Sequence, residues 1–161
     1  MTILIPVTTA SSDRGDWEGG VPEGCTSITA GKRATVDGSV ITSHTDDSHR
    51  TRSWMDIVPA ALHGDGAEVT MYSREKDTTL AMPAYRHAPI GTIPQVERTF
   101  GYLNTAYPSI NEKQLAIGES TFGGREELQS DEGLIDCQRL CMLMLQRAST
   151  AREAIRIAGE L

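Results

Sequence analysis

Two short segments of β-branched and small residues predict a β-hairpin near the start of the chain. Residues 26–30 and 39–44 both fit extended strands, because β-branched side chains favour a strand backbone. Between them, the Asp37-Gly38 pair favours the positive φ angle of a tight turn. The hairpin is therefore expected to begin directly after Cys25.

The middle of the chain alternates apolar and polar residues less regularly. Residues 67–73 predict a strand, and residues 78–85 predict another that Pro83 interrupts or places at a sheet edge. After a proline-punctuated region, residues 114–118 predict a short buried strand. Fold class is therefore mixed α and β.

Two helices are predicted near the end of the sequence. The first is capped by Ser130 or Asp131 and runs to about Arg147. The second begins at Thr150, where Glu153 completes a capping box. Apolar spacing of three and four residues predicts core positions on their inner faces, namely Leu134, Cys137, Cys141, Met144, Ala154, Ile155 and Ala158.

The pattern divides the chain into a flexible leader, residues 1–24, and one domain, residues 25–161. Residues 8–24 are rich in Thr, Ser, Gly and acidic residues and show no periodicity. At the other end, the last helix reaches Leu161 without a Gly, Asn or Pro stop signal. We therefore expect the sequence to be part of a longer protein, with exposed strand edges and apolar surface where strands are missing.

Composition narrows the function classes. The chain has 39% hydrophobic residues, 23% charged residues and a formal net charge of −7. Such an acidic chain argues against nucleic acid as a ligand, and no stretch reaches the roughly 18 apolar residues of a membrane span. The short apolar run at residues 3–7 lacks a preceding basic residue, so no secretion signal is recognised and a cytoplasmic location is expected.

The three cysteines are too few, and odd in number, for a disulfide framework. Cys137 and Cys141 are spaced for packing on one helix face, where a free cysteine acts as a small buried hydrophobe. They lack the four close ligands of a structural zinc site. We therefore expect no metal site, and Cys25 is the remaining cysteine with a candidate chemical role.

The segment CTSITAGKRATVDGSVITSHTDD, residues 25–47, resembles the mature start of cysteine dipeptidases of the N-terminal-nucleophile hydrolase class, of the bacterial dipeptidase A type. The segment INEKQLAIGESTFGGREEL, residues 110–128, resembles a second block of the same family. The resemblance implies a four-layer αββα sandwich, incomplete in this chain. It also implies hydrolysis of dipeptide substrates without a metal or organic cofactor.

The implied nucleophile is Cys25, freed as a new amino terminus by cleavage after Gly24. A thiol with an ordinary pKa near 8.5 needs a base beside it. The α-amino group of the same residue, with a pKa of about 7.7 to 8.0, can accept the thiol proton. Cleavage is either autocatalytic or the work of another protease, and Gly24 adds no side chain to obstruct it.

The resemblance also implies further site residues. Asp47, in preference to Asp46, would hold the new α-amino group, and Thr121 would be a donor of the oxyanion hole or a substrate contact. Related penicillin and bile-salt acylases carry an Arg where this chain has His44. His44 is therefore expected to donate a hydrogen bond to substrate or to pack.

Two charged residues of the second block complete the candidate site. Arg125 could bind a peptide carboxylate through a bidentate pair, and Glu119 is a candidate substrate contact. The alternative is that Glu119 and Arg125 form a structural ion pair.

Two other functions remain open from the sequence. One is an acylase of the same fold that cleaves a non-peptide amide such as a penicillin or a bile-salt conjugate. The other is a non-catalytic domain in which Cys25 stays internal. The sequence also leaves the oligomeric state open, a homo-oligomer included.

Overall fold

The computed structural model describes residues 25–46, 55–77, 84–120, 124–128, 130 and 132–161. These residues form a mixed α and β structure with small antiparallel sheets and two α-helices. The mixed class is therefore confirmed. The predicted leader, residues 1–24, lies outside the described residues.

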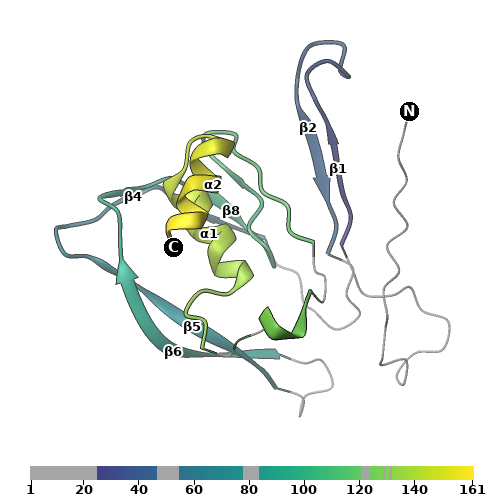
Figure 1. Cartoon of the computed structure of the whole chain (residues 1–161). Coiled ribbons are helices and arrows are strands. Elements are labelled where there is room, and N and C mark those ends of the chain that lie inside the picture. The colour runs from purple at the N-terminus through teal and green to yellow at the C-terminus, as the bar shows by residue number, and fades with distance from the viewer. Residues whose placement is uncertain (1–24, 47–54, 78–83, 121–123, 129, 131) are drawn as a thin grey trace.

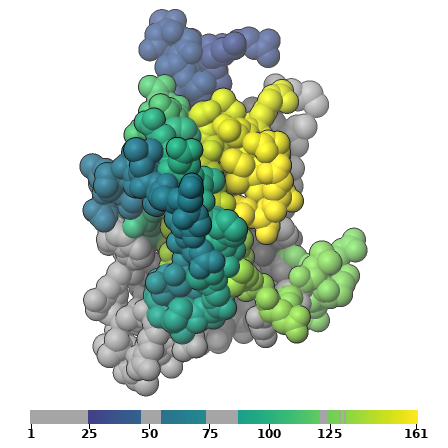
Figure 2. Space-filling view, turned by 90° about the vertical axis from the view of Figure 1, so that its left-hand side faces the viewer, coloured from purple at the N-terminus to yellow at the C-terminus, as the bar shows by residue number. Residues whose placement is uncertain are grey.

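The predicted hairpin is confirmed. Strand β1 (Ser27–Ala30) pairs antiparallel with β2 (Ile41–His44). At the turn, Gly38 has a φ of 76° and the Asp37 carboxylate accepts a hydrogen bond from Ser39 N at 3.0 Å. In Figures 1 and 2 the hairpin projects from one end of the molecule.

A long two-stranded ribbon follows. Strand β5 (Glu68–Asp77) pairs antiparallel with β6 (Ala84–Pro94), with an irregularity between Met71 and Tyr72. The strand predicted at 67–73 is thus confirmed and longer than expected. Much of the one predicted at 78–85, Pro83 included, lies outside the described residues.

A small central sheet joins segments far apart in the sequence. Strand β8 (Tyr102–Asn104) lies between β3 (Asp56–Val58) and β9 (Ile110–Asn111). Nearby, β4 (Ala61–Leu62) pairs with β7 (Arg98–Thr99). All of these strands have two or three residues, too few for a periodicity that the sequence could reveal.

The strand predicted at residues 114–118 is wrong. The segment makes one isolated bridge, between Ile110 and Ala116, and Gln114 adopts a φ of 61°, which an extended strand does not allow. Leu115 is nevertheless buried, as the pattern suggested. The segment instead folds back against the residues before it, with Ile117 N bonded to Ser109 O at 2.8 Å.

Helix α1 (Cys137–Arg147) begins later than predicted. Its N-cap is Asp136, whose carboxylate accepts a hydrogen bond from Arg139 N at 2.7 Å. Ser130 instead accepts a bond from Glu132 N in the preceding turn, and Asp131 lies outside the described residues. Because the helix starts at Cys137, this side chain is exposed in the first turn, contrary to the predicted core position, whereas Cys141 is buried.

Helix α2 (Ala151–Glu160) begins at the predicted cap, with Thr150 Oγ1 accepting a bond from Glu153 N. The Glu153 carboxylate bonds to Ser149 N at 2.8 Å, one residue before the expected partner. Ala154 is buried as predicted, but Ile155 is exposed. Ile157 packs against the core in its place.

The main core forms where the helices meet the central sheet (Figure 1). It contains Tyr102, Leu115, Leu145, Ala148 and Ala154.

Buried Asn111 ties this core together. Its amide nitrogen donates to the carbonyls of Leu145 and Ala148, both at 2.8 Å. Its side-chain oxygen accepts bonds from Lys113 N and Leu115 N. One side chain therefore joins the end of α1 to the segment that leads toward residue 118.

Candidate active site

Cys25 lies half-buried at the base of the hairpin. Its Sγ donates a hydrogen bond to the Glu119 carboxylate, with 3.9 Å between Sγ and Oε2. The Ser120 hydroxyl donates to the Cys25 carbonyl at 3.5 Å. The cysteine is therefore held by a segment more than ninety positions later in the chain.

Hairpin pairing continues below the strands toward Cys25. Thr45 N donates to Thr26 O at 2.9 Å, and Thr26 N donates to Thr45 Oγ1 at 3.0 Å. The strand register itself ends at Ser27 and His44, so Cys25 and Asp46 lie just beyond the paired strands.

His44 also faces the segment that holds the cysteine. Its Nε2 contacts the Glu119 carbonyl oxygen, and because a carbonyl can only accept, Nε2 carries the proton. His44 therefore donates to backbone here, and its role toward substrate stays a prediction.

The approach of the two segments depends on Gly118. A Cβ at this position would lie 2.9 Å from Ser27 Oγ and 3.5 Å from His44 Cδ2. The missing side chain lets the backbone reach the hairpin.

The structure thus brings together three of the six residues selected from the sequence, Cys25, His44 and Glu119. Arg125 lies apart from them: it precedes the short helix η1 (Glu126–Leu128) and forms an exposed ion pair with Glu127 at 3.8 Å. Asp47 and Thr121 lie outside the described residues.

A cleft of about 470 Å³ opens beside this cluster. It begins at His44 and Gly118, next to the residue that binds Cys25 Sγ, and extends over the central sheet. Its wall combines hairpin residues with apolar and small polar residues of two later segments. The lining consists of Thr42, His44, Asp46, Met55, Leu103, Thr105, Ala106, Tyr107, Ser109, Ile110, Ala116, Ile117 and Gly118.

Sequence reasoning missed most of this lining. Asp46 belongs to the Asp-Asp pair, of which the sequence analysis selects Asp47 as the site residue. Leu103, Thr105 and Tyr107 belong to a proline-punctuated stretch with no clear period, so no local signal marks them.

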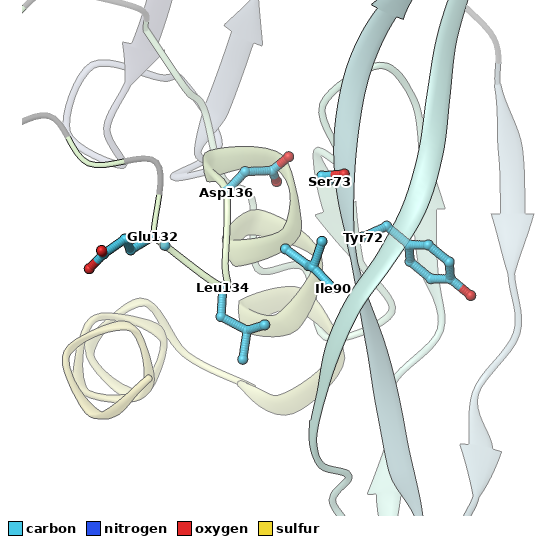
Figure 3. Close-up of a pocket in the computed structure, with 7 residues that line it drawn as sticks. Tyr72, Ser73, Ile90, Glu132, Leu134 and Asp136 are labelled. Atoms are coloured by element: carbon cyan, nitrogen blue, oxygen red, sulfur yellow. The ribbon is translucent and has the colours of Figure 1, made fainter.

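A second hollow, of about 440 Å³, lies between the β5–β6 ribbon and the segment before α1 (Figure 3). Ile90 and Leu134 face each other across it, while the Tyr72 ring points away. Its acidic residues are Glu132 and Asp136, and the latter already caps α1. Neither Cys25 nor His44 lines this hollow.

The other two cysteines, Cys137 and Cys141, both belong to helix α1. A hydrogen bond with Cys137, followed by burial, raises the pKa of the Cys141 thiol, so Cys141 stays neutral at physiological pH. Cys137 is exposed on α1. The Cys25 thiol donates to the Glu119 carboxylate, and Glu119 directly follows Gly118 of the cleft wall.

Within the described residues, no group of three or more His, Cys, Asp or Glu side chains gathers where it could hold a metal ion. The described helices are also all too short or too polar to cross a membrane.

Comparison with known proteins gives two matches. The model of a family described as Peptidase family C69 matches residues 24–161. A "Probable dipeptidase" of Latilactobacillus sakei is 30% identical over 149 residues, which cover 85% of this chain. The chain spans about 29% of the length of that relative. No solved structure matches significantly.

Proposed function

This chain belongs to peptidase family C69, and from that premise we propose that it hydrolyses dipeptides with Cys25 as its nucleophile. Family membership implies a hydrolase that acts on peptides. The name of the L. sakei relative supports dipeptides as the substrates. The observation that carries the proposal is the Cys25 thiol held beside the Glu119 carboxylate, which directly follows Gly118 of the cleft wall.

The reaction begins with cleavage of the peptide bond between Gly24 and Cys25, which removes the leader, residues 1–24. The released α-amino group accepts the thiol proton, and the thiolate attacks the substrate's carbonyl carbon. Collapse of the tetrahedral intermediate breaks the peptide bond, and the protonated amine transfers its proton to the departing amino acid. Water then hydrolyses the thioester and regenerates the thiol.

The surrounding residues take supporting roles in this proposal. Asp47 holds the new α-amino group, Thr121 stabilises the oxyanion, and Arg125 binds the substrate's carboxylate. His44 and Glu119 contact the substrate. The last two roles are supported by the contact of Glu119 with the Cys25 thiol and by that of His44 with the Glu119 carbonyl.

The proposal includes the four-layer sandwich of two stacked sheets between helix layers. The hairpin supports it through its exposed apolar side chains. Ile28 and Ile41 are 67% and 59% exposed, as expected of strands that pack against further layers.

The test is a hydrolysis panel on the full-length protein, with intact-mass measurement of its amino terminus. We expect loss of residues 1–24, turnover of several dipeptides and loss of at least about 1,000-fold in kcat/KM for Cys25→Ala made without residues 1–24. The matched control is Cys137→Ser, which changes an exposed thiol and should retain full activity. Equal activity in the Cys25→Ala protein would reject the proposal.

The same panel separates the rival functions. Turnover of penicillin or bile-salt amides without turnover of dipeptides would indicate an acylase. An unprocessed chain without either activity would indicate a non-catalytic domain.

A further inference from the structure

We propose that Glu119 is the general base for removal of the leader, acting on the Cys25 thiol before the new amino terminus exists. This inference rests on the proposed function, which requires cleavage between Gly24 and Cys25. It makes that cleavage a reaction of the chain on itself. It also gives Glu119 a task that precedes any contact with a substrate.

The thiol needs a different base before cleavage from the one it uses afterwards. In the uncut chain the nitrogen of Cys25 belongs to the peptide bond with Gly24, and a peptide nitrogen is a donor that accepts no proton. The α-amino group is therefore a product of the cleavage and cannot start it. A thiol with an ordinary pKa of about 8.5 is mostly protonated at neutral pH, and the protonated form is a poor nucleophile.

The structure is that of the uncut chain, and it brings a carboxylate to this thiol. Cys25 Sγ donates to Glu119 Oε2 at 3.9 Å, and both residues are half-buried. A general base must lie within hydrogen-bond reach of the proton that it removes, and Glu119 meets this condition. His44 cannot replace it through Nε2, because that nitrogen already donates to the Glu119 carbonyl.

Contacts on both sides of Glu119 hold its carboxylate in place. Before it, the missing side chain of Gly118 lets the backbone approach the hairpin. At Glu119 itself the carbonyl accepts a bond from His44, and after it the Ser120 hydroxyl donates to the Cys25 carbonyl at 3.5 Å. Three successive residues therefore fix the base relative to the thiol, and such positioning is a large part of catalysis.

The reaction begins when Glu119 takes the thiol proton as Cys25 Sγ attacks the carbonyl carbon of Gly24. A carboxylate is a weaker base than a thiolate, so the proton moves during the attack. The bond from this carbon to the Cys25 nitrogen then breaks, and the nitrogen receives the proton from Glu119. Residues 1–24 are left as a thioester on the sulfur. Water hydrolyses it, releasing the leader as a carboxylic acid and regenerating the thiol beside a free α-amino group.

The main test follows loss of the leader by intact mass, over time, in full-length protein made by a purified translation mixture without proteases. We expect Glu119→Gln to slow the loss about 100-fold, within the range for a general base. Gln keeps the size of Glu and an oxygen that accepts the thiol hydrogen bond, but it lacks the basicity. Glu112→Gln changes an exposed carboxylate of the same segment and should match the wild-type rate. An unchanged rate in Glu119→Gln would overturn the inference.

Chemical rescue separates a base from a residue that only positions the thiol. Added formate should accelerate leader loss several-fold in Glu119→Ala and leave the wild-type rate unchanged. A folded Glu119→Ala protein that does not respond to formate would count against the inference. If this variant does not fold, Glu119→Asp retains a carboxylate and should lose its leader faster than Glu119→Gln. A folded Asp variant that is no faster would also count against it.

Hydroxylamine shows which step depends on Glu119. This reagent cleaves thioesters, so it releases the leader as a hydroxamate from any protein in which the thioester has formed. We expect no acceleration in Glu119→Gln, because this variant stalls before the thioester. Rapid release from it would place the defect in the hydrolysis step and overturn a role in the attack.

Failure of this inference and failure of the proposed function give different results. A wild-type protein that keeps residues 1–24 in the translation mixture, but hydrolyses dipeptides when it is produced without them, would reject the inference alone. A wild-type protein that loses its leader at a rate dependent on Glu119, but hydrolyses no dipeptide, would reject the proposed function alone.

Discussion

The β1–β2 hairpin and the region around α1 contain similar apolar residues but bury them very differently. In the hairpin, Ile28 and Ile41 are 67% and 59% exposed, whereas Leu143 and Leu145 of α1 are fully buried. The hairpin forms because its turn residues favour it locally. Its burial depends on what packs against it, which turn chemistry does not decide.

The comparison also locates the candidate site. A two-stranded hairpin by itself is only marginally stable in water. Here its base is held by residues 118–120, through the contacts of Cys25 and His44 with Glu119. The nucleophile therefore lies at the junction between the exposed element and the packed one.

The largest expected effect comes from truncating one apolar residue in each region. Leu145→Ala should lower the free energy of unfolding by about 4 kcal/mol, because it leaves a cavity in a packed core. In this 161-residue chain, Ile41→Ala removes a side chain that is mostly in water and should cost about 0.5 kcal/mol. Urea denaturation measures both, and similar losses would contradict the contrast in packing.

A smaller effect is expected at the junction. Gly118→Ala places a Cβ 2.9 Å from Ser27 Oγ and should shift the hairpin base, costing about 1 kcal/mol of stability and roughly 10-fold in kcat/KM. Steady-state kinetics and thermal unfolding measure the two losses.

Relief of the clash gives the control for this prediction. Adding Ser27→Ala to the Gly118→Ala protein should restore most of the activity, because the crowding oxygen is gone. Gly31→Ala, at a hairpin glycine with nothing within 4 Å of the added carbon, should be neutral. Failure of the double variant to recover would mean that close approach is not what Gly118 provides.

The smallest effect is expected at the cap of α2, on the packed side. Hydrogen bonds from Ser149 hold the pKa of the exposed Glu153 carboxyl below its usual range. A lowered folded pKa stabilises the protein above the unfolded pKa, and the benefit disappears as the pH falls through the folded value. The Tm difference between wild type and Glu153→Gln should therefore shrink between about pH 6 and pH 3. A constant difference would contradict this cap.

The features that the sequence revealed are local ones. Asp37-Gly38 specifies the hairpin turn and Thr150 specifies the start of α2, since each acts within a few residues. The predicted start of α1 was wrong because Ser130 and Asp131 are earlier cap candidates than Asp136, whereas the exposure of Ile155 depends on packing that is not local. The short strands of the central sheet pair segments that are distant in sequence, so no local pattern predicts them.

The candidate site divides in the same way. Cys25, His44 and Glu119 could be selected from the two sequence blocks, and the structure brings them together. The place of Asp46 in the cleft could not be predicted, because the facing wall at residues 103–109 comes from a segment without periodicity. The roles of Asp47 and Thr121 remain predictions.

The amide of Asn111 has a consequence for how the molecule loosens. By holding two carbonyls at the end of α1 and two backbone amides of residues 113–115, it makes fraying of that helix end and release of the following loop a single event. The loop continues to Glu119, which binds the Cys25 thiol, so we expect motion at the end of α1 to reach Cys25. A ligand that restricts motion at Cys25 should therefore also restrict fraying of α1.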